Sequence, residues 1–139
     1  MRWQSPSAGA TATRSRTFTE EDVELFARIS GDRNPLHFDA DFAAGTRAGG
    51  LIVHGGLTTG LFNALVAEVL PGPGSVFLHQ EWDYPAPVYI GDTITARAEV
   101  VSLHETKPVT QLRIVVTRQD GEVVLEGEAW CYTLVPNAR

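Results

Sequence analysis

The stretch Gly56 to Leu70 reads GLTTGLFNALVAEVL, and it decides the fold. Glu68 is its single charged residue, and a Pro-Gly-Pro-Gly run at 71–74 ends it abruptly. A helix that is apolar on nearly every side is stable only when other structure surrounds it. We therefore expect a long buried helix over 56–70.

The chain after this helix changes to strand-forming sequence. Turn signals separate the runs rich in β-branched and aromatic residues, and Asp120-Gly121 is a typical hairpin turn. The four predicted strands are Ser75–Tyr84, Thr93–Leu103, Val109–Arg118 and Val123–Val135. Strands that follow one another through turns pair antiparallel, so the predicted fold class is α+β, with a curved antiparallel sheet wrapped around the helix. The free edges of such a sheet favour a homodimer.

A second helix is predicted ahead of the buried one. Thr19 and Asp22 have the spacing of a capping box, which places the first helical residue near Glu20. Pro35 disfavours helical geometry at the residue before it, so the helix is expected to stop near Ser30. A further helical turn is expected over 39–44.

Length and composition fit one folded domain. The 139 residues are 43% hydrophobic and 20% charged, which is ordinary for a globular protein. Residues 1–16 contain no acidic group and no apolar block, so we expect a mobile N-terminal tail there and a single domain over 17–139.

Charge and cysteine content exclude several functions. The net charge of −6 and the absence of a basic run argue against nucleic-acid binding, and no apolar stretch is long enough for a membrane span. Cys131 is the single cysteine, so an intrachain disulfide is excluded. These features predict a cytoplasmic protein.

Two motifs carry the chemistry: FARISGDRNPLH at 26–37, and IVHGG at 52–56 where the buried helix begins. The first resembles the hydratase motif of the MaoC-like, R-specific enoyl-CoA hydratases, whose hot-dog fold is a long helix wrapped by an antiparallel sheet. The resemblance extends from Thr17 onward. It implies reversible syn hydration of trans-2-enoyl thioesters to (R)-3-hydroxyacyl thioesters, without a cofactor.

The resemblance also implies residue roles. Asp32 is the principal base, and His37 orients the water and shares the proton transfers. The backbone N–H of Gly55 binds the thioester carbonyl, where free helix N-terminal donors favour a developing anion. Asn34 and Pro35 shape the loop between the catalytic residues. Without His37, Asp32 in this turn-rich sequence would be interpreted as a turn residue.

The chain departs from the family pattern on the long helix. Gly60 stands where the R-specific hydratases generally carry a serine that bonds the catalytic aspartate, and Thr59 is the candidate replacement for that hydroxyl. Gly56 stands where the family often has methionine. This glycine, with Leu57, predicts an acyl pocket with room for larger groups.

The remaining histidines are not predicted to take part in catalysis or metal binding. His54 is expected to be a structural histidine whose ring bonds the backbone. The four histidines, His37, His54, His79 and His104, lack ligand-like spacing, so no metal site is predicted.

Three alternative functions remain open. The same catalytic pair could act as a dehydratase on a 3-hydroxyacyl group carried by a carrier protein in fatty acid or polyketide synthesis. A hot-dog thioesterase would hydrolyse the thioester, and a non-catalytic hot-dog subunit would be expected to lose the catalytic pair.

Overall fold

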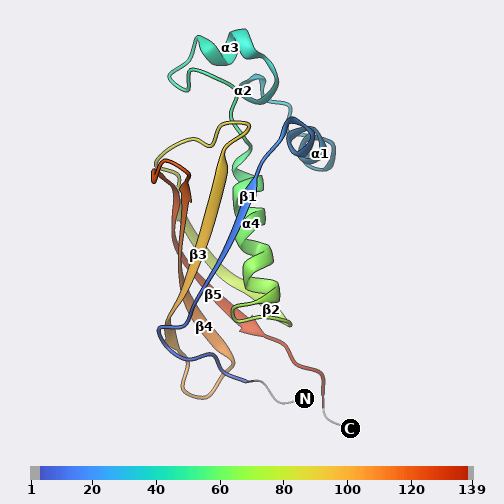
Figure 1. The fold of residues 1–139 in the computed structure, drawn as a ribbon. Coiled ribbons are helices and arrows are strands. Elements are labelled where there is room, and N and C mark those ends of the chain that lie inside the picture. Colours follow the sequence, from blue (N-terminus) through green and yellow to red (C-terminus); the bar gives the residue numbers. More distant parts are fainter. Residues whose placement is uncertain (1–3, 138–139) are drawn as a thin grey trace.

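The computed structural model describes residues 4–137, in which one long helix lies along a five-stranded sheet (Figure 1). The elements follow in the order β1 (Thr11–Thr17), α1 (Glu20–Ser30), α2 (Pro35–Phe38), α3 (Ala40–Ala44), α4 (Gly55–Glu68), β2 (Ser75–Asp83), β3 (Thr93–Leu103), β4 (Val109–Arg118) and β5 (Val123–Thr133).

The sheet has the strand order β1-β3-β4-β5-β2, and every neighbouring pair is antiparallel. Helix α4 runs along one face of this sheet, and helices α1, α2 and α3 gather at one end of the molecule (Figure 1). The predicted α+β class, with an antiparallel sheet around a buried helix, is confirmed.

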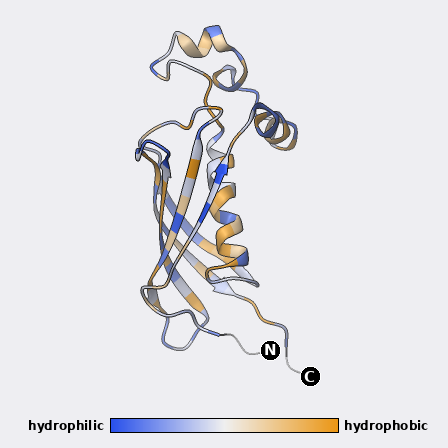
Figure 2. Ribbon diagram, viewed as in Figure 1, coloured by the Kyte–Doolittle hydropathy of each residue, from blue (hydrophilic) through white to orange (hydrophobic). Residues whose placement is uncertain are grey.

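The core lies between α4 and the sheet. Alternate residues of the central strands turn toward the helix, as the two-residue period of a strand requires; on β4 these are Thr110, Leu112, Ile114 and Val116. From α4, Phe62 and Leu65 are fully buried against them. Figure 2 shows that most of α4 has apolar colouring. Because α4 packs against the buried face of the sheet, most of its positions favour apolar residues over charged ones.

The boundary predicted between tail and domain is wrong. Residues 11–16, assigned to a mobile tail, belong to β1, which pairs with β3 from Thr11 opposite Glu99 to Thr17 opposite Thr93. Cross-strand hydroxyl contacts, such as Ser15 Oγ to Thr95 Oγ1 at 2.7 Å, add to the backbone pairing. The contact with β3 continues before β1, because the Gly9 N–H donates to the Val100 carbonyl at 2.8 Å. An exposed edge strand has no apolar alternation to reveal it.

Apart from the short helix α2, which was not predicted, the other elements begin and end close to their predicted positions. The capping box of α1 is present, with Thr19 Oγ1 accepting from the Asp22 N–H and the Asp22 carboxylate accepting from the Thr19 N–H. Within residues 4–137, no helix is long and apolar enough to cross a membrane.

Candidate active site

A tight loop joins α1 to α2 and carries the catalytic candidates. Gly31 ends α1 with φ 80°, and its N–H donates to the Ala27 carbonyl at 2.8 Å. This left-handed geometry favours glycine. Pro35 then opens α2, and Asn34 Oδ1 accepts from the Leu36 N–H at 3.1 Å. Residues 31–34 therefore form a loop between α1 and α2, and the two do not continue as one helix.

An ion pair anchors this loop to α1. Both terminal nitrogens of Arg33 donate to the Glu24 carboxylate, at 3.3 and 3.0 Å. This hydrogen bond holds the pKa of Glu24 below, and the pKa of Arg33 above, their ordinary values. The guanidinium carbon also lies 5.5 Å from the centre of the Phe38 ring, so Arg33 connects α1 to α2.

Asp32 and His37 face each other across this loop. Asp32 Oδ1 accepts from the Asn34 N–H at 3.1 Å, and Oδ2 lies 3.9 Å from His37 Nε2. That separation exceeds a direct hydrogen bond, yet a water placed beside the line between the two atoms can reach both. The Asp32 side chain is 48% exposed and that of His37 is 8% exposed, so the pair lies where the interior meets solvent.

A backbone carbonyl selects the tautomer of His37. Its Nδ1 lies 2.7 Å from the Ile52 oxygen, which can only accept, so Nδ1 carries the proton. In the neutral ring, Nε2 then presents a lone pair toward Asp32. Both atoms facing the gap are consequently acceptors, and a water between them would donate one proton to each.

His54 completes a cluster that sequence spacing does not reveal. Its ring stacks on His37 with centroids 3.8 Å apart, and its Nε2 donates to the Asp32 carbonyl at 2.9 Å. The predicted backbone bond of His54 is thus present, but the bond goes to the catalytic loop. His79 and His104 do not belong to this cluster.

The cluster contains residue types that bind metal ions, but its geometry does not suit one. Asp32, His37 and His54 offer possible ligand atoms within 4.8 Å of one another. However, the two imidazoles are stacked with an interplanar angle of 28°. Nitrogen lone pairs lie in the ring planes, so those of nearly parallel, stacked rings do not converge on a common ion about 2 Å from both nitrogens. The Nε2 of His54 is also engaged by the Asp32 carbonyl, and this geometry disfavours metal binding.

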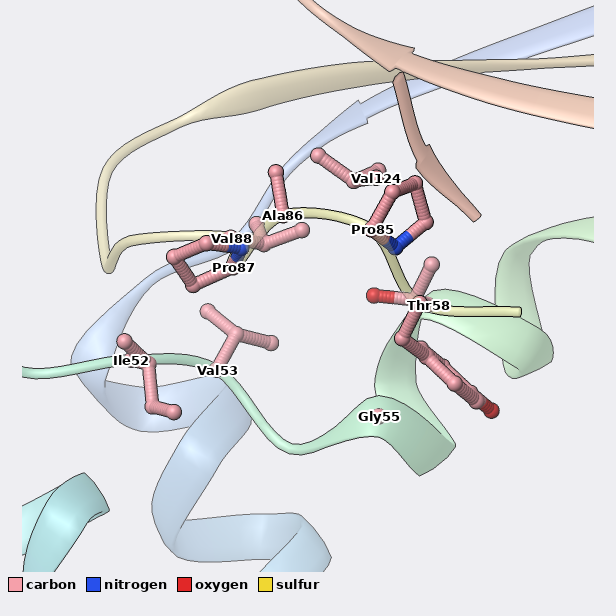
Figure 3. Close-up of a pocket in the computed structure, with 10 residues that line it drawn as sticks. Ile52, Val53, Gly55, Thr58, Pro85, Ala86, Pro87, Val88 and Val124 are labelled. Carbon is pink, nitrogen blue, oxygen red and sulfur yellow. The ribbon is translucent and has the colours of Figure 1, made fainter. Parts of the chain in front are cut away.

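The amino end of α4 opens beside this cluster. His54 is the N-cap residue, and no side chain caps the helix there. Gly55 lines a cavity of about 420 Å³ whose other walls are mostly apolar (Figure 3). The lining residues are Ile52, Val53, Gly55, Thr58, Tyr84, Pro85, Ala86, Pro87, Val88 and Val124. Burial raises the pKa of Tyr84, so its hydroxyl stays protonated at neutral pH.

The acyl-pocket residues predicted on α4 do not line this cavity. A Cβ atom on Gly56 would lie 2.8 Å from Cε2 of Phe26 and closer still to Cζ, so the Phe26 ring fills the space that the glycine leaves. Leu57 packs against the core and lines a different cavity, beside β1. The cavity instead involves Gly55 and Thr58, which lie around the helix from Gly56.

Thr59 does not support Asp32 in this structure. Its hydroxyl donates to the Gly56 carbonyl at 3.0 Å, a bond that threonine commonly makes to its own helix. At Gly60, a Cβ atom would meet nothing within 4 Å. Among the described residues, no side-chain hydroxyl from α4 hydrogen-bonds the Asp32 carboxylate; the Asn34 N–H is its hydrogen-bond donor.

Comparison with known proteins shows the family of this chain. The family model described as MaoC like domain matches residues 4–124. The chain belongs to the MaoC-like family. A MaoC-like relative, the (R)-specific enoyl-CoA hydratase of Aeromonas caviae, is 42% identical over 129 residues, covering 93% of this chain and 96% of the relative. The 3-hydroxybutyryl-CoA dehydratase of Methylorubrum extorquens is 41% identical, covering 87% of this chain and 76% of the relative.

Solved structures of MaoC-like proteins share the fold. The structure of the (R)-hydratase from A. caviae involved in PHA biosynthesis superposes with a TM-score of 0.89 at 40% identity, covering 94% of this chain and 99% of that chain. The hot-dog fold expected from the two motifs is confirmed. The family match begins at residue 4, so it includes β1 as well.

Proposed function

We propose that this protein is an (R)-specific enoyl-CoA hydratase, which reversibly adds water to trans-2-enoyl thioesters to give (R)-3-hydroxyacyl thioesters. The observation that carries the proposal is the pair of acceptors, Asp32 Oδ2 and His37 Nε2, separated by 3.9 Å. The pair lies next to the uncapped amino end of α4. The identity to the A. caviae hydratase supports the same activity.

The acceptor pair would activate one water. A water that donates one proton to Asp32 and one to His37 directs an oxygen lone pair away from both, toward Cβ of the substrate. As the oxygen bonds to Cβ, Asp32 takes a proton, and the electrons of the double bond move to the thioester as an enolate. The pair then returns that proton to Cα. Because both groups lie on the same side of the substrate, water adds to one face of the alkene.

Gly55 would stabilise the enolate oxygen. The first residues of a helix have N–H groups without helical partners, and the helix dipole favours negative charge there. No acidic residue lies in the first turn of α4 to oppose it. Loss of one such donor typically costs about 10²–10³ in rate.

The cavity beside Gly55 is our candidate for the acyl pocket. Its walls are mainly aliphatic and proline side chains from residues 52–53, the β2–β3 connection and the start of β5 (Figure 3). A volume of about 420 Å³ lies within the usual range for small-molecule sites. Thr58 points its hydroxyl toward this space and is the polar side chain of α4 on the wall.

The test is direct. Purified protein is incubated with crotonyl-CoA, and loss of the enoyl absorbance is followed together with release of free thiol. We expect hydration without thiol release, and a fall of about 10²–10⁴ in kcat for both Asp32→Asn and His37→Ala. Asp41→Asn, which neutralises an exposed carboxylate on α3, is the matched control and should keep full activity. Thiol release would indicate a thioesterase, and hydration unaffected by either substitution would refute the assigned pair.

The substrate carrier needs a separate measurement. The same residues would act on a thioester attached to a carrier protein, so kcat/KM is compared for crotonyl-CoA and for the crotonyl group on an acyl carrier protein. We expect the CoA thioester to be preferred. A cytosolic location is also part of the proposal, supported by the single cysteine and the acidic composition.

Homodimer formation is proposed through the β2 edge of the sheet. This edge strand pairs with β5 on one side, has no neighbouring strand on its other side within the described chain, and exposes Val76 and Leu78, which are 45% and 58% accessible. Unpaired backbone groups and exposed apolar side chains on an edge favour pairing with a second copy. Light scattering should give twice the chain mass of 15.1 kDa, and Leu78→Lys should shift the protein toward the monomer.

A further inference from the structure

The rings of Phe26, His54 and His37 pack one on the next, and we call them the ring column. The Phe26 ring on α1 packs against His54, with centroids 4.7 Å apart and an interplanar angle of 50°. The His54 ring also stacks on the His37 ring, with centroids 3.8 Å apart. Gly56 makes this column possible, because any side chain at that position would overlap the Phe26 ring.

His54 contacts both members of the pair by different means. Its Nε2–H donates to the main-chain carbonyl of Asp32, and its ring face limits rotation of the His37 imidazole. It is 1% exposed, so these contacts are shielded from solvent. His54 Nδ1 has no hydrogen-bond partner within the described chain, so the bond from Nε2 to the Asp32 carbonyl is the hydrogen bond that fixes this ring.

We propose that His54, backed by Phe26, is the positioning residue that keeps Asp32 Oδ2 and His37 Nε2 at the separation needed to hold one water. The inference rests on the proposed hydratase activity and assigns His54 a role in it. Both catalytic side chains come from a short loop and a four-residue helix, which by themselves fix their geometry weakly. His54 belongs to the connection into the long, buried helix α4, so it transmits the rigidity of the core to that loop.

A purely structural histidine would have different consequences. Its loss would lower the free energy of unfolding and the fraction of folded protein, but the folded molecules would retain the His37 tautomer and their turnover. Loss of a positioning contact leaves the enzyme folded while the acceptors move apart. A misplacement of about 1 Å can cost 10²-fold in rate, with ground-state binding much less affected.

Two substitutions separate the two contacts. His54→Gln retains an amide donor for the Asp32 carbonyl but loses the ring face against His37. His54→Phe retains a ring face and loses the donor. His104→Asn is the matched control, because this distant histidine uses Nδ1 to accept from the Thr106 and Lys107 N–H groups, and the asparagine oxygen can accept in its place.

Two readouts are taken on protein shown to be folded by its near-ultraviolet spectrum. For crotonyl-CoA hydration, we expect kcat of each His54 variant to fall by up to about 10²-fold with KM changed less than threefold, and the control to match wild type. In ¹⁵N NMR spectra of the imidazoles, wild-type His37 should show a single Nδ1–H tautomer. In His54→Gln, the His37 ring should rotate away from the Ile52 carbonyl part of the time, so its signals should average between the two tautomers.

The measurements distinguish failure of the His54 role from failure of the proposed hydratase function. Wild-type turnover in both His54 variants, or a fall in kcat with the His37 tautomer unchanged in His54→Gln, would overturn the positioning role while leaving the hydratase assignment intact. An inactive wild-type protein would instead overturn the proposed function. If the His54 variants do not fold, Phe26→Leu carries the test, because it removes the support for His54 without touching the pair; unchanged kcat in that variant would equally refute the inference.

Discussion

Replacing Gly56 by alanine offers the sharpest test of the packing behind the site. Only a methyl group is added, yet its carbon would lie 2.8 Å from Phe26 Cε2 and 3.1 Å from Cε1. Real carbon contacts are about 3.5–4.0 Å, so the ring or the helix must move. Gly60→Ala on the same helix is the matched control, since a Cβ there meets nothing within 4 Å.

The two substitutions should differ in sign. In a helix interior, glycine is about 1 kcal/mol less favourable than alanine, so Gly60→Ala should stabilise the protein by about that amount. Overpacking typically costs about 1–3 kcal/mol, and residue 56 is the second residue of α4, where the gain in helix propensity is smaller. We therefore expect Gly56→Ala to be less stable than Gly60→Ala by about 2 kcal/mol.

Urea unfolding at one fixed protein concentration measures this difference, because association would otherwise alter the apparent free energy of unfolding. Phe26→Ala removes the ring and with it the overlap. In that background, Gly56→Ala should therefore no longer lower the free energy of unfolding. Equal unfolding free energies for Gly56→Ala and Gly60→Ala would show that Phe26 does not occupy the space above Gly56, and the ring column would lose its support.

Four other results are expected. Gly31→Ala should destabilise the protein by about 1–2 kcal/mol, measured in urea, and should also reduce hydration, because φ is 80° at the start of the catalytic loop. Leu65→Ala should cost about 2–5 kcal/mol, since this side chain is fully buried in the core, and a loss below 1 kcal/mol would contradict that packing. Burial raises the pKa of Cys131 to about 12, so a thiol reagent at pH 8 should label the unfolded chain and not the native one. Burial works to raise the pKa of Asp22, but hydrogen bonds from Thr19 and Arg16 outweigh it and lower the pKa below 3.8. The stability from Asp22 is therefore complete above about pH 3.8 and is lost as pH falls through the lower folded value, a dependence that should vanish in Asp22→Asn.

Local signals predicted most of the secondary structure. The capping box at Thr19 gave the start of α1, and Gly31 with Pro35 gave its end, because these residues act on the backbone beside them. The strands β2 to β5 were predicted within two residues at each end, since their apolar alternation reports burial on one face. Strand β1 was missed because it is polar and exposed, and its pairing partner lies about 80 residues away.

The candidate site was only partly predictable. Asp32, His37 and Gly55 stand out through their motifs, whereas His54 looked like a backbone-bonded histidine without catalytic relevance. Its stacking on His37 joins residues 17 positions apart, and no local pattern encodes such a contact. The sequence could not show what lies beside Gly56 for the same reason: a glycine shows that bulk is absent from the helix, but not which neighbour occupies the space, and the Phe26 ring occupies it.

The amino-acid sequence by itself determined that a helix with one charged residue must be enclosed, that an antiparallel sheet would enclose it, and which loop carries the carboxylate and imidazole. These features follow from propensity, capping and burial, which act over a few residues. Tertiary structure alone decided the 3.9 Å gap between the acceptors, the tautomer selected by the Ile52 carbonyl, and the ring column behind them. These depend on the packing of α1 and α4 against each other, and packing is set by side chains that are distant along the chain.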